Sequence, residues 1–130
     1  MLLFYELKQK ILKAEIIKDR ILVIIFFAAL LINIGLFVFL YYKIPQLVSL
    51  MKTDIITLHY NIYFGGDYIG DSGKIFSLPI LGFMIFLINT ILAFFLYIRA
   101  KILSYYLAII SLICQIILFF CEYLILLFNK

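Results

Sequence analysis

Residues 21–42 read ILVIIFFAALLINIGLFVFLYY and include no charged side chain. As an α-helix they extend about 33 Å, which matches a bilayer hydrocarbon core of roughly 30 Å. Tyr41 and Tyr42 suit the headgroup region, where amphipathic rings are favoured. The segment therefore predicts a membrane-spanning helix, and we expect Lys43 and Pro45 to end it.

The composition of the whole chain supports the same class. Of its 130 residues, 68% are hydrophobic, and the mean hydropathy is +1.23. A soluble domain is only about 45–50% apolar, and a chain of this length has too little interior for so many Leu, Ile and Phe side chains. We therefore predict an all-α membrane protein of one domain, residues 1–130, with three transmembrane helices at residues 21–42, 75–98 and 102–128.

The connections follow from the spacing of the charges. Only residues 99–101 separate the second and third helices, so these two should form a tight antiparallel hairpin. Pro79 would fall in the first turn of the second helix, where its missing N–H costs little.

Residues 1–20 indicate a helix that lies on the membrane surface. Leu3, Leu7, Ile11 and Ala14 share one helical face, and polar side chains occupy most of the other. A secretory signal peptide is the competing interpretation. The apolar segment that follows is too long for one, and no small-x-small cleavage site follows it.

The basic residues predict the orientation. Seven lie before the first helix or in the turn at residues 99–101, against four on the opposite side. The positive-inside rule then places the protein in the cell membrane with a cytoplasmic N-terminus and an outer C-terminus. The basic N-terminal segment favours anionic lipid headgroups as a partner, with no nucleic acid; a topology signal alone is the alternative.

Residues 43–74 form the one long segment that a bilayer cannot hold. They contain the only His and four of the six Gly residues. Apolar side chains at alternate positions from Ile56 to Phe64 have the period of a strand with one apolar face. Gly65 and Gly66 suit a turn, and residues 67–70 a short returning strand. This outer loop is therefore predicted to include a β-hairpin that rests on the helix ends, the bilayer surface or another chain.

The loop also resembles a known family. It carries, in order, His59, Tyr60, Asn61, Gly65, Asp67 and Gly70, then Lys74 and a helix entered at Pro79. This order resembles a small prokaryotic multi-helix membrane domain of unknown function, whose loop reads approximately P-x-x-I-P-x-H-[FYW]-N-x-x-G-x-P-D. The domain is also found in membrane proteins that give immunity to toxic peptides.

The resemblance covers residues 20–98. Thr53 and Thr57 stand where the family has proline, Gly66 replaces a third proline, and one extra residue separates Asn61 from Gly65. It implies a prokaryotic membrane protein. Apart from the resemblance, the polar side chains that the loop presents around its two-glycine turn predict a binding site there. The candidate binding residues are His59, Tyr60, Asn61, Gly65, Asp67 and Gly70.

The sequence offers little support for catalysis. His59, Asp67 and Asp71 are ordinary metal-ligand types, but the alternative is a hydrogen-bonded loop His with Asp residues that cap turns. No H-E-x-x-H, G-x-S-x-G or phosphate-loop motif occurs. An enzyme would have to depend on His59 or Glu122. We expect no catalytic residue, no metal and no cofactor.

Polar residues within the apolar segments form the second candidate set. Asn33, Asn89 and Gln115 each fall near the bilayer midplane, where an unpaired amide is costly, so we expect the three to hydrogen-bond one another. We expect Glu122, near the outer end, to reach water or a basic group. One face of the third helix should meet its neighbours: Ser104, Ala108, Ser111, Gln115, Leu118 and Glu122.

These observations favour a non-catalytic membrane protein that acts in recognition or packing within the membrane. Its partner would be another membrane protein or a peptide, and the resemblance implies an immunity-like role. The alternative is a small transporter or channel subunit that uses Glu122 and the midplane amides.

Overall fold

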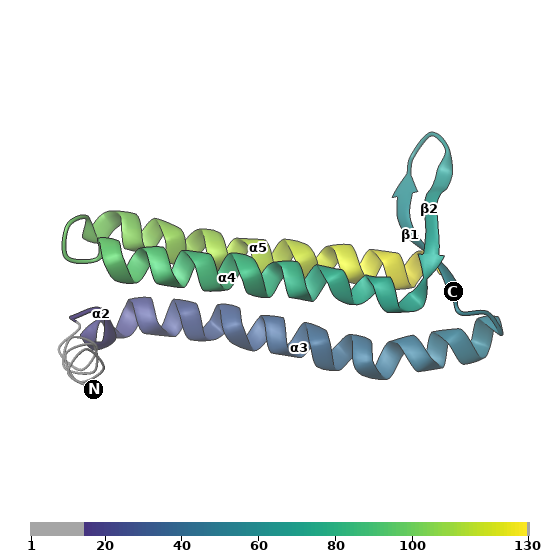
Figure 1. Ribbon diagram of the computed structural model, residues 1–130, viewed down its shortest axis with the longest axis horizontal. Coiled ribbons are helices and arrows are strands. Elements are labelled where there is room, and N and C mark those ends of the chain that lie inside the picture. Colours follow the sequence, from purple (N-terminus) through teal and green to yellow (C-terminus); the bar gives the residue numbers. More distant parts are fainter. Residues whose placement is uncertain (1–14, 130) are drawn as a thin grey trace, which may run out of the picture.

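A computed structural model describes residues 15–129, in which three long helices lie side by side with a β-hairpin at one end (Figure 1). The helices are α3 (Arg20–Met51), α4 (Ser77–Leu96) and α5 (Lys101–Phe128). A short helix α2 (Glu15–Lys18) precedes α3, and the 3-10 helix η1 (Ser72–Phe76) leads into α4. The three predicted helical segments are thus confirmed as helices.

Three segments are long and apolar enough to cross a membrane: Arg20–Met51, Ser72–Leu96 and Lys101–Phe128. Helices α4 and α5 are antiparallel neighbours joined by residues 97–100, as the charge spacing predicts. Pro79 lies in the first turn of α4, also as predicted. Of the predicted surface helix at residues 1–20, the part up to residue 14 lies outside the described residues.

The two ends of the bundle differ. One end carries α2 and the α4–α5 connection, and we call it the α2 end; the other carries the hairpin, and we call it the hairpin end (Figure 1). At the α2 end, Asp19 is the N-cap of α3, and its side chain accepts a hydrogen bond from Leu22 N at 3.4 Å. Asp is among the preferred N-cap residues because its carboxylate satisfies a free N–H of the first turn.

Helix α3 continues through Lys43 and Pro45 to Met51, so the prediction that these residues end it is wrong. Pro45 removes one backbone hydrogen bond at a cost of about 3 kcal/mol. Beyond the predicted end, however, Ile44 and Leu47 are both buried, and burial contributes about 1.5–3 kcal/mol for each such side chain. The 32 residues of α3 extend about 48 Å, so its last turns pass beyond a hydrocarbon core of roughly 30 Å.

The predicted hairpin is present, but its turn lies elsewhere. Strand β1 (Ile55–Asn61) pairs antiparallel with β2 (Gly65–Asp71), and Asn61 stands opposite Gly65. The turn is therefore residues 62–64, and both glycines belong to β2. Gly65 has φ of 75°, the left-handed conformation that follows a three-residue hairpin turn and that glycine adopts without strain.

The apolar face predicted for β1 is correct only for its first half. Ile56 is buried, and the half-buried Leu58 packs against the same cluster. Ile62 and Phe64 belong to the turn and are 98% and 82% exposed. The pairing is irregular between Thr57 and Tyr60, so the strict alternation of a flat strand does not continue to the turn.

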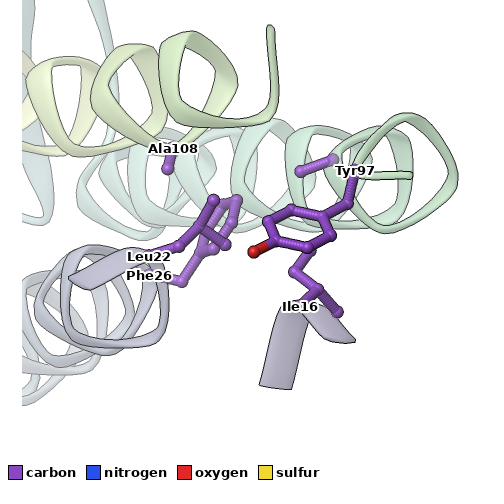
Figure 2. Close-up of a cluster of buried hydrophobic side chains, with 6 residues drawn as sticks. Ile16, Leu22, Phe26, Tyr97 and Ala108 are labelled. Carbon is purple, nitrogen blue, oxygen red and sulfur yellow. The ribbon is translucent and has the colours of Figure 1, made fainter. Parts of the chain in front are cut away.

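Two apolar clusters hold the helices together. The α2-end cluster brings side chains of α2, α3, α4 and α5 together with Tyr97, and Figure 2 shows Ile16, Leu22 and Tyr97 turned toward one another. The hairpin-end cluster joins α3, α5, η1 and β1, and its buried members are Leu40, Ile44, Leu47, Ile56, Ile75 and Leu126. Between these clusters lies a layer of buried polar side chains.

Candidate functional site

The hairpin is fastened to the C-terminal end of α5 by Asn129. Thr57 N donates to Asn129 Oδ1 at 2.7 Å, and Asn129 Nδ2 donates to Thr57 O at 2.7 Å. The side-chain amide thus pairs with β1 as a neighbouring strand would. The ring of Tyr60 also stacks on Phe128, with centroids 4.7 Å apart. Sequence analysis missed Asn129, because nothing but its place after the last apolar helix distinguishes it.

The base of the hairpin is closed by a second set of contacts. Ser72 Oγ donates to Asp54 Oδ1 at 2.5 Å, and Ser72 N donates to Asp54 O at 2.8 Å. Asp71 caps η1 by accepting from Gly73 N at 3.0 Å. Buried Ile56 and Ile75 bring β1 and η1 into one cluster. The hairpin is therefore held on the bundle from both of its strands.

His59 and Asp67 face each other across the two strands. His59 Nδ1 and Asp67 Oδ1 are 2.5 Å apart, and both side chains are exposed. The hydrogen bond from His59 lowers the pKa of the Asp67 carboxyl below its ordinary range. Asp71 does not join them, and within residues 15–129 no three His, Cys, Asp or Glu side chains are grouped as metal ligands would be. His59, Asp67 and Asp71 therefore do not come together as a set of metal ligands.

The remaining candidate binding residues have structural roles. Tyr60 turns toward Phe128, and Asn61 Oδ1 accepts from Tyr63 N at 2.9 Å within the turn. Gly65 supplies the left-handed turn conformation, and a Cβ on Gly70 would lie 3.1 Å from Leu58 Cδ1. Of the six predicted residues, His59, Tyr60 and Asp67 are exposed, and Tyr60 has its ring stacked on Phe128.

The most exposed part of the hairpin is its turn. Ile62, Tyr63 and Phe64 are 98%, 88% and 82% exposed, and we call these three residues the hairpin tip. Figure 1 shows the hairpin standing across the direction of the helices, so that the tip lies away from the bundle. Three adjacent large apolar side chains are thus presented on a fixed support.

Two of the three predicted midplane amides form a buried polar layer. Asn33 Nδ2 donates to Gln115 Oε1 at 3.1 Å and to Pro79 O at 3.0 Å, and Gln115 Nε2 donates to Gly82 O at 2.7 Å. These bonds join α3, α4 and α5. A Cβ on Gly82 would lie 2.7 Å from Gln115 Oε1, so only glycine lets the amide approach this closely.

Asn89 does not join the layer, contrary to the prediction. Its Nδ2 is buried without a hydrogen-bond partner among the described residues. The α4 residue that meets Gln115 is Gly82, and Asn89 lies seven residues further along, about 10 Å nearer the α2 end. The three amides were predicted at only roughly the same depth in the bilayer. A difference of two helical turns is enough to keep Asn89 out of hydrogen-bonding distance of the other two.

The predicted inner face of α5 is confirmed. Ser104, Ala108, Ser111, Gln115 and Glu122 are all buried, and Leu118 is half-buried. Ser104 Oγ donates to Ala93 O at 2.9 Å. The expectation that Glu122 reaches water or a basic group is wrong: its carboxylate oxygens are buried, and neither has a hydrogen-bond partner within residues 15–129. Glu122 lies seven residues from both Gln115 and Asn129, and that spacing keeps it on the face that the other helices cover.

Asp19 gathers a polar cluster at the α2 end that sequence analysis also missed. Its carboxylate accepts from Tyr105 Oη at 2.7 Å and Tyr97 Oη at 2.8 Å, and pairs with Lys101 Nζ at 3.1 Å. The hydrogen bond from Tyr105, with those from Tyr97 and Lys101, holds the pKa of the Asp19 carboxyl well below its usual range. The cluster ties the start of α3 to the α4–α5 connection.

Comparison with known proteins gives no assignment. No family model, curated protein or solved structure matches the chain. Its function must therefore be argued from the geometry of the hairpin and of the polar residues inside the bundle.

Proposed function

We propose that the protein is an integral protein of the cell membrane whose three helices span the bilayer. The N-terminus lies in the cytoplasm, and the hairpin and the C-terminus lie outside. Three apolar helices and the uneven distribution of basic residues support this placement. So do the many large apolar side chains on the helix surfaces; Ile24, Phe95 and Ile117 are each more than half exposed.

The hairpin is the recognition element in this proposal, and its partner is another membrane protein or a peptide. The observation that carries the proposal is the exposed hairpin tip on a base fixed by Asn129, Ser72 and the hairpin-end cluster. Aromatic side chains are enriched in the buried centres of protein interfaces. A support that is already ordered also lowers the entropic cost of binding.

His59 and Asp67 supply the polar part of this surface, and no catalytic step is needed. A charge-assisted hydrogen-bonded pair beside the apolar hairpin tip can fix the orientation of a bound partner and select among partners. An immunity-like role, in which the partner is a toxic peptide, is the form of the proposal that the family resemblance suggests.

Crosslinking in the native membrane tests this function. A photo-crosslinking amino acid in place of Tyr63 should give an adduct with a defined protein or peptide. The same probe in place of Leu50, which is exposed at the same end but outside the hairpin, should not. The double variant His59→Ala/Asn61→Ala should reduce the adduct while helix content is unchanged. Adducts with lipid alone at Tyr63 would refute recognition by the tip.

Glu122 favours a second candidate function, that of a small transporter or channel subunit. Its buried, unpartnered carboxylate shares the inner face of α5 with Gln115 and with Ser111, whose hydroxyl also has no partner among residues 15–129. Ionisable residues inside membrane segments are characteristic of proton and ion pathways. In proteoliposomes, proton flux that is present in the wild type and lost in Glu122→Gln would favour this function. Absence of flux in both would favour recognition.

A further inference from the structure

A groove lies on the surface between α3 and α4 at the α2 end, far from the hairpin. Its volume is about 300 Å³, at the lower end of the range for ligand pockets. Its walls include Ile17, Val23, Phe27, Phe86, Thr90 and Phe94. The one hydroxyl among these, that of Thr90, donates to Phe86 O at 2.7 Å, so none of the described wall residues has a free side-chain donor.

The shape of the groove suits a hydrocarbon chain. The α4 wall runs from Phe86 to Phe94, eight residues or about 12 Å along the helix. Its floor is closed, because Leu22 and Phe26 belong to the α2-end cluster and pack with Ile16 (Figure 2). The groove is thus a shallow apolar channel parallel to the helices, the direction in which lipid chains lie beside a transmembrane bundle.

Two basic residues follow closely in the chain after the groove residue Ile17. Lys18 and Arg20 are exposed and flank Asp19, next to the wall residue Ile17. Asp19 does not neutralise them, because its carboxylate is already bound by Tyr97, Tyr105 and Lys101. In the described part of the chain, the salt bridges include neither Lys18 nor Arg20. With respect to the side chains of residues 16–129, these two cations are therefore unpaired and can pair with an anion near the end of the groove.

We propose that this groove binds one acyl chain of an anionic phospholipid, and that Lys18 and Arg20 pair with its headgroup phosphate. An extended peptide in the groove would leave backbone N–H and C=O groups unpaired in hydrocarbon, whereas an acyl chain has none. An α-helix pairs its own backbone groups, but with side chains it is about 10–12 Å wide, too wide for a groove of about 300 Å³. The cations distinguish anionic from zwitterionic lipids, because each basic residue near an anionic surface contributes about 1 kcal/mol. The inference rests on the proposed membrane placement and is independent of the hairpin.

The absence of Trp from the chain allows a direct test. Phe27→Trp places the only Trp in the groove wall, and Ile109→Trp places it on the exposed surface of α5 at a similar depth. Each variant is reconstituted in phosphatidylcholine vesicles that contain chain-spin-labelled phosphatidylglycerol or phosphatidylcholine. At position 27 we expect stronger quenching by phosphatidylglycerol than by phosphatidylcholine, and at position 109 equal quenching by both.

Two further variants define the site. Lys18→Gln and Arg20→Gln should each lower the preference for phosphatidylglycerol at position 27 about five-fold, the factor that corresponds to about 1 kcal/mol. Thr90→Phe, which fills the groove, should reduce quenching at position 27 and leave position 109 unchanged. The same lipid preference at both positions would overturn the groove proposal alone. Loss of quenching at both positions would overturn the membrane placement and the groove together.

Discussion

At the scale of single residues, Asn33 and Gln115 make the hydrogen bonds that join all three long helices. We expect Asn33→Leu to lower the free energy of unfolding by about 0.5–2 kcal/mol, the range for interhelical hydrogen bonds in membranes. The loss arises because Pro79 O and Gln115 Oε1 are left with fewer donors. Reversible denaturation in mixed lipid–detergent micelles measures it.

Asn89→Leu is the matched control, since it makes the same substitution on a neighbouring helix. Asn89 Nδ2 is buried without a partner among the described residues, so its removal relieves an unsatisfied donor. We expect stability to be unchanged or slightly higher. A loss equal to that of Asn33→Leu would show that Asn89 takes part in the polar layer after all.

Asp19 gives a pH-dependent prediction. The hydrogen bond from Tyr105, with those from Tyr97 and Lys101, lowers the pKa of this carboxyl from its ordinary 3.8. A group with a lowered folded pKa contributes stability that is complete above its unfolded pKa and is lost as pH falls toward the folded value. The Tm difference between wild type and Asp19→Asn should therefore be constant from about pH 7 to pH 5 and shrink below pH 3.8. A difference that disappears near neutral pH would contradict this.

At the scale of elements, the hairpin is stable because α5 supplies its missing neighbour. An isolated two-stranded hairpin is marginal in water, and here Asn129 pairs with the Thr57 backbone. We expect Asn129→Ala to accelerate amide hydrogen exchange in β1 about ten-fold, which corresponds to about 1.4 kcal/mol for an unpaired backbone group. Hydrogen-exchange mass spectrometry measures this, and exchange in α4 should not change.

Asn61→Ala is the control for that experiment. Asn61 Oδ1 accepts from Tyr63 N within the turn, and its side chain also bonds Asp67 on the neighbouring strand, so its loss should raise exchange near the tip without releasing β1 from α5. If Asn129→Ala leaves β1 as protected as the wild type does, the hairpin-end cluster alone holds the hairpin.

At the scale of the whole molecule, the orientation of the bundle is open to a labelling test. We expect a cysteine at Tyr63 to react with an impermeant thiol reagent in intact cells, and one at Ile98 to be protected. Both residues are well exposed at opposite ends of the bundle, so differences in burial do not confuse the result. Cys114 and Cys121 are free and are first replaced by Ala. The reverse labelling pattern would invert the proposed topology.

The sequence alone determined the elements that depend on local pattern. Long uncharged segments predicted the three helices, a period of two predicted the start of β1, and steps of three and four predicted the buried face of α5. Each of these patterns recurs over many consecutive residues, and every recurrence strengthens the prediction of the helix or strand. The resemblance of the loop to a membrane domain and the role in recognition remain predictions.

Only the tertiary structure decided which polar side chains meet one another. Helix α3 continues past Pro45 because Ile44 and Leu47 are buried in the hairpin-end cluster, among residues distant in the sequence. Asn89 lies two helical turns away from the polar layer and does not join it. The roles of Asn129 and Asp19 depend on hydrogen bonds to residues more than 70 positions away in the sequence. Such contacts depend on how the helices align along their axes. That alignment is set by packing among all three helices, and no local pattern encodes it.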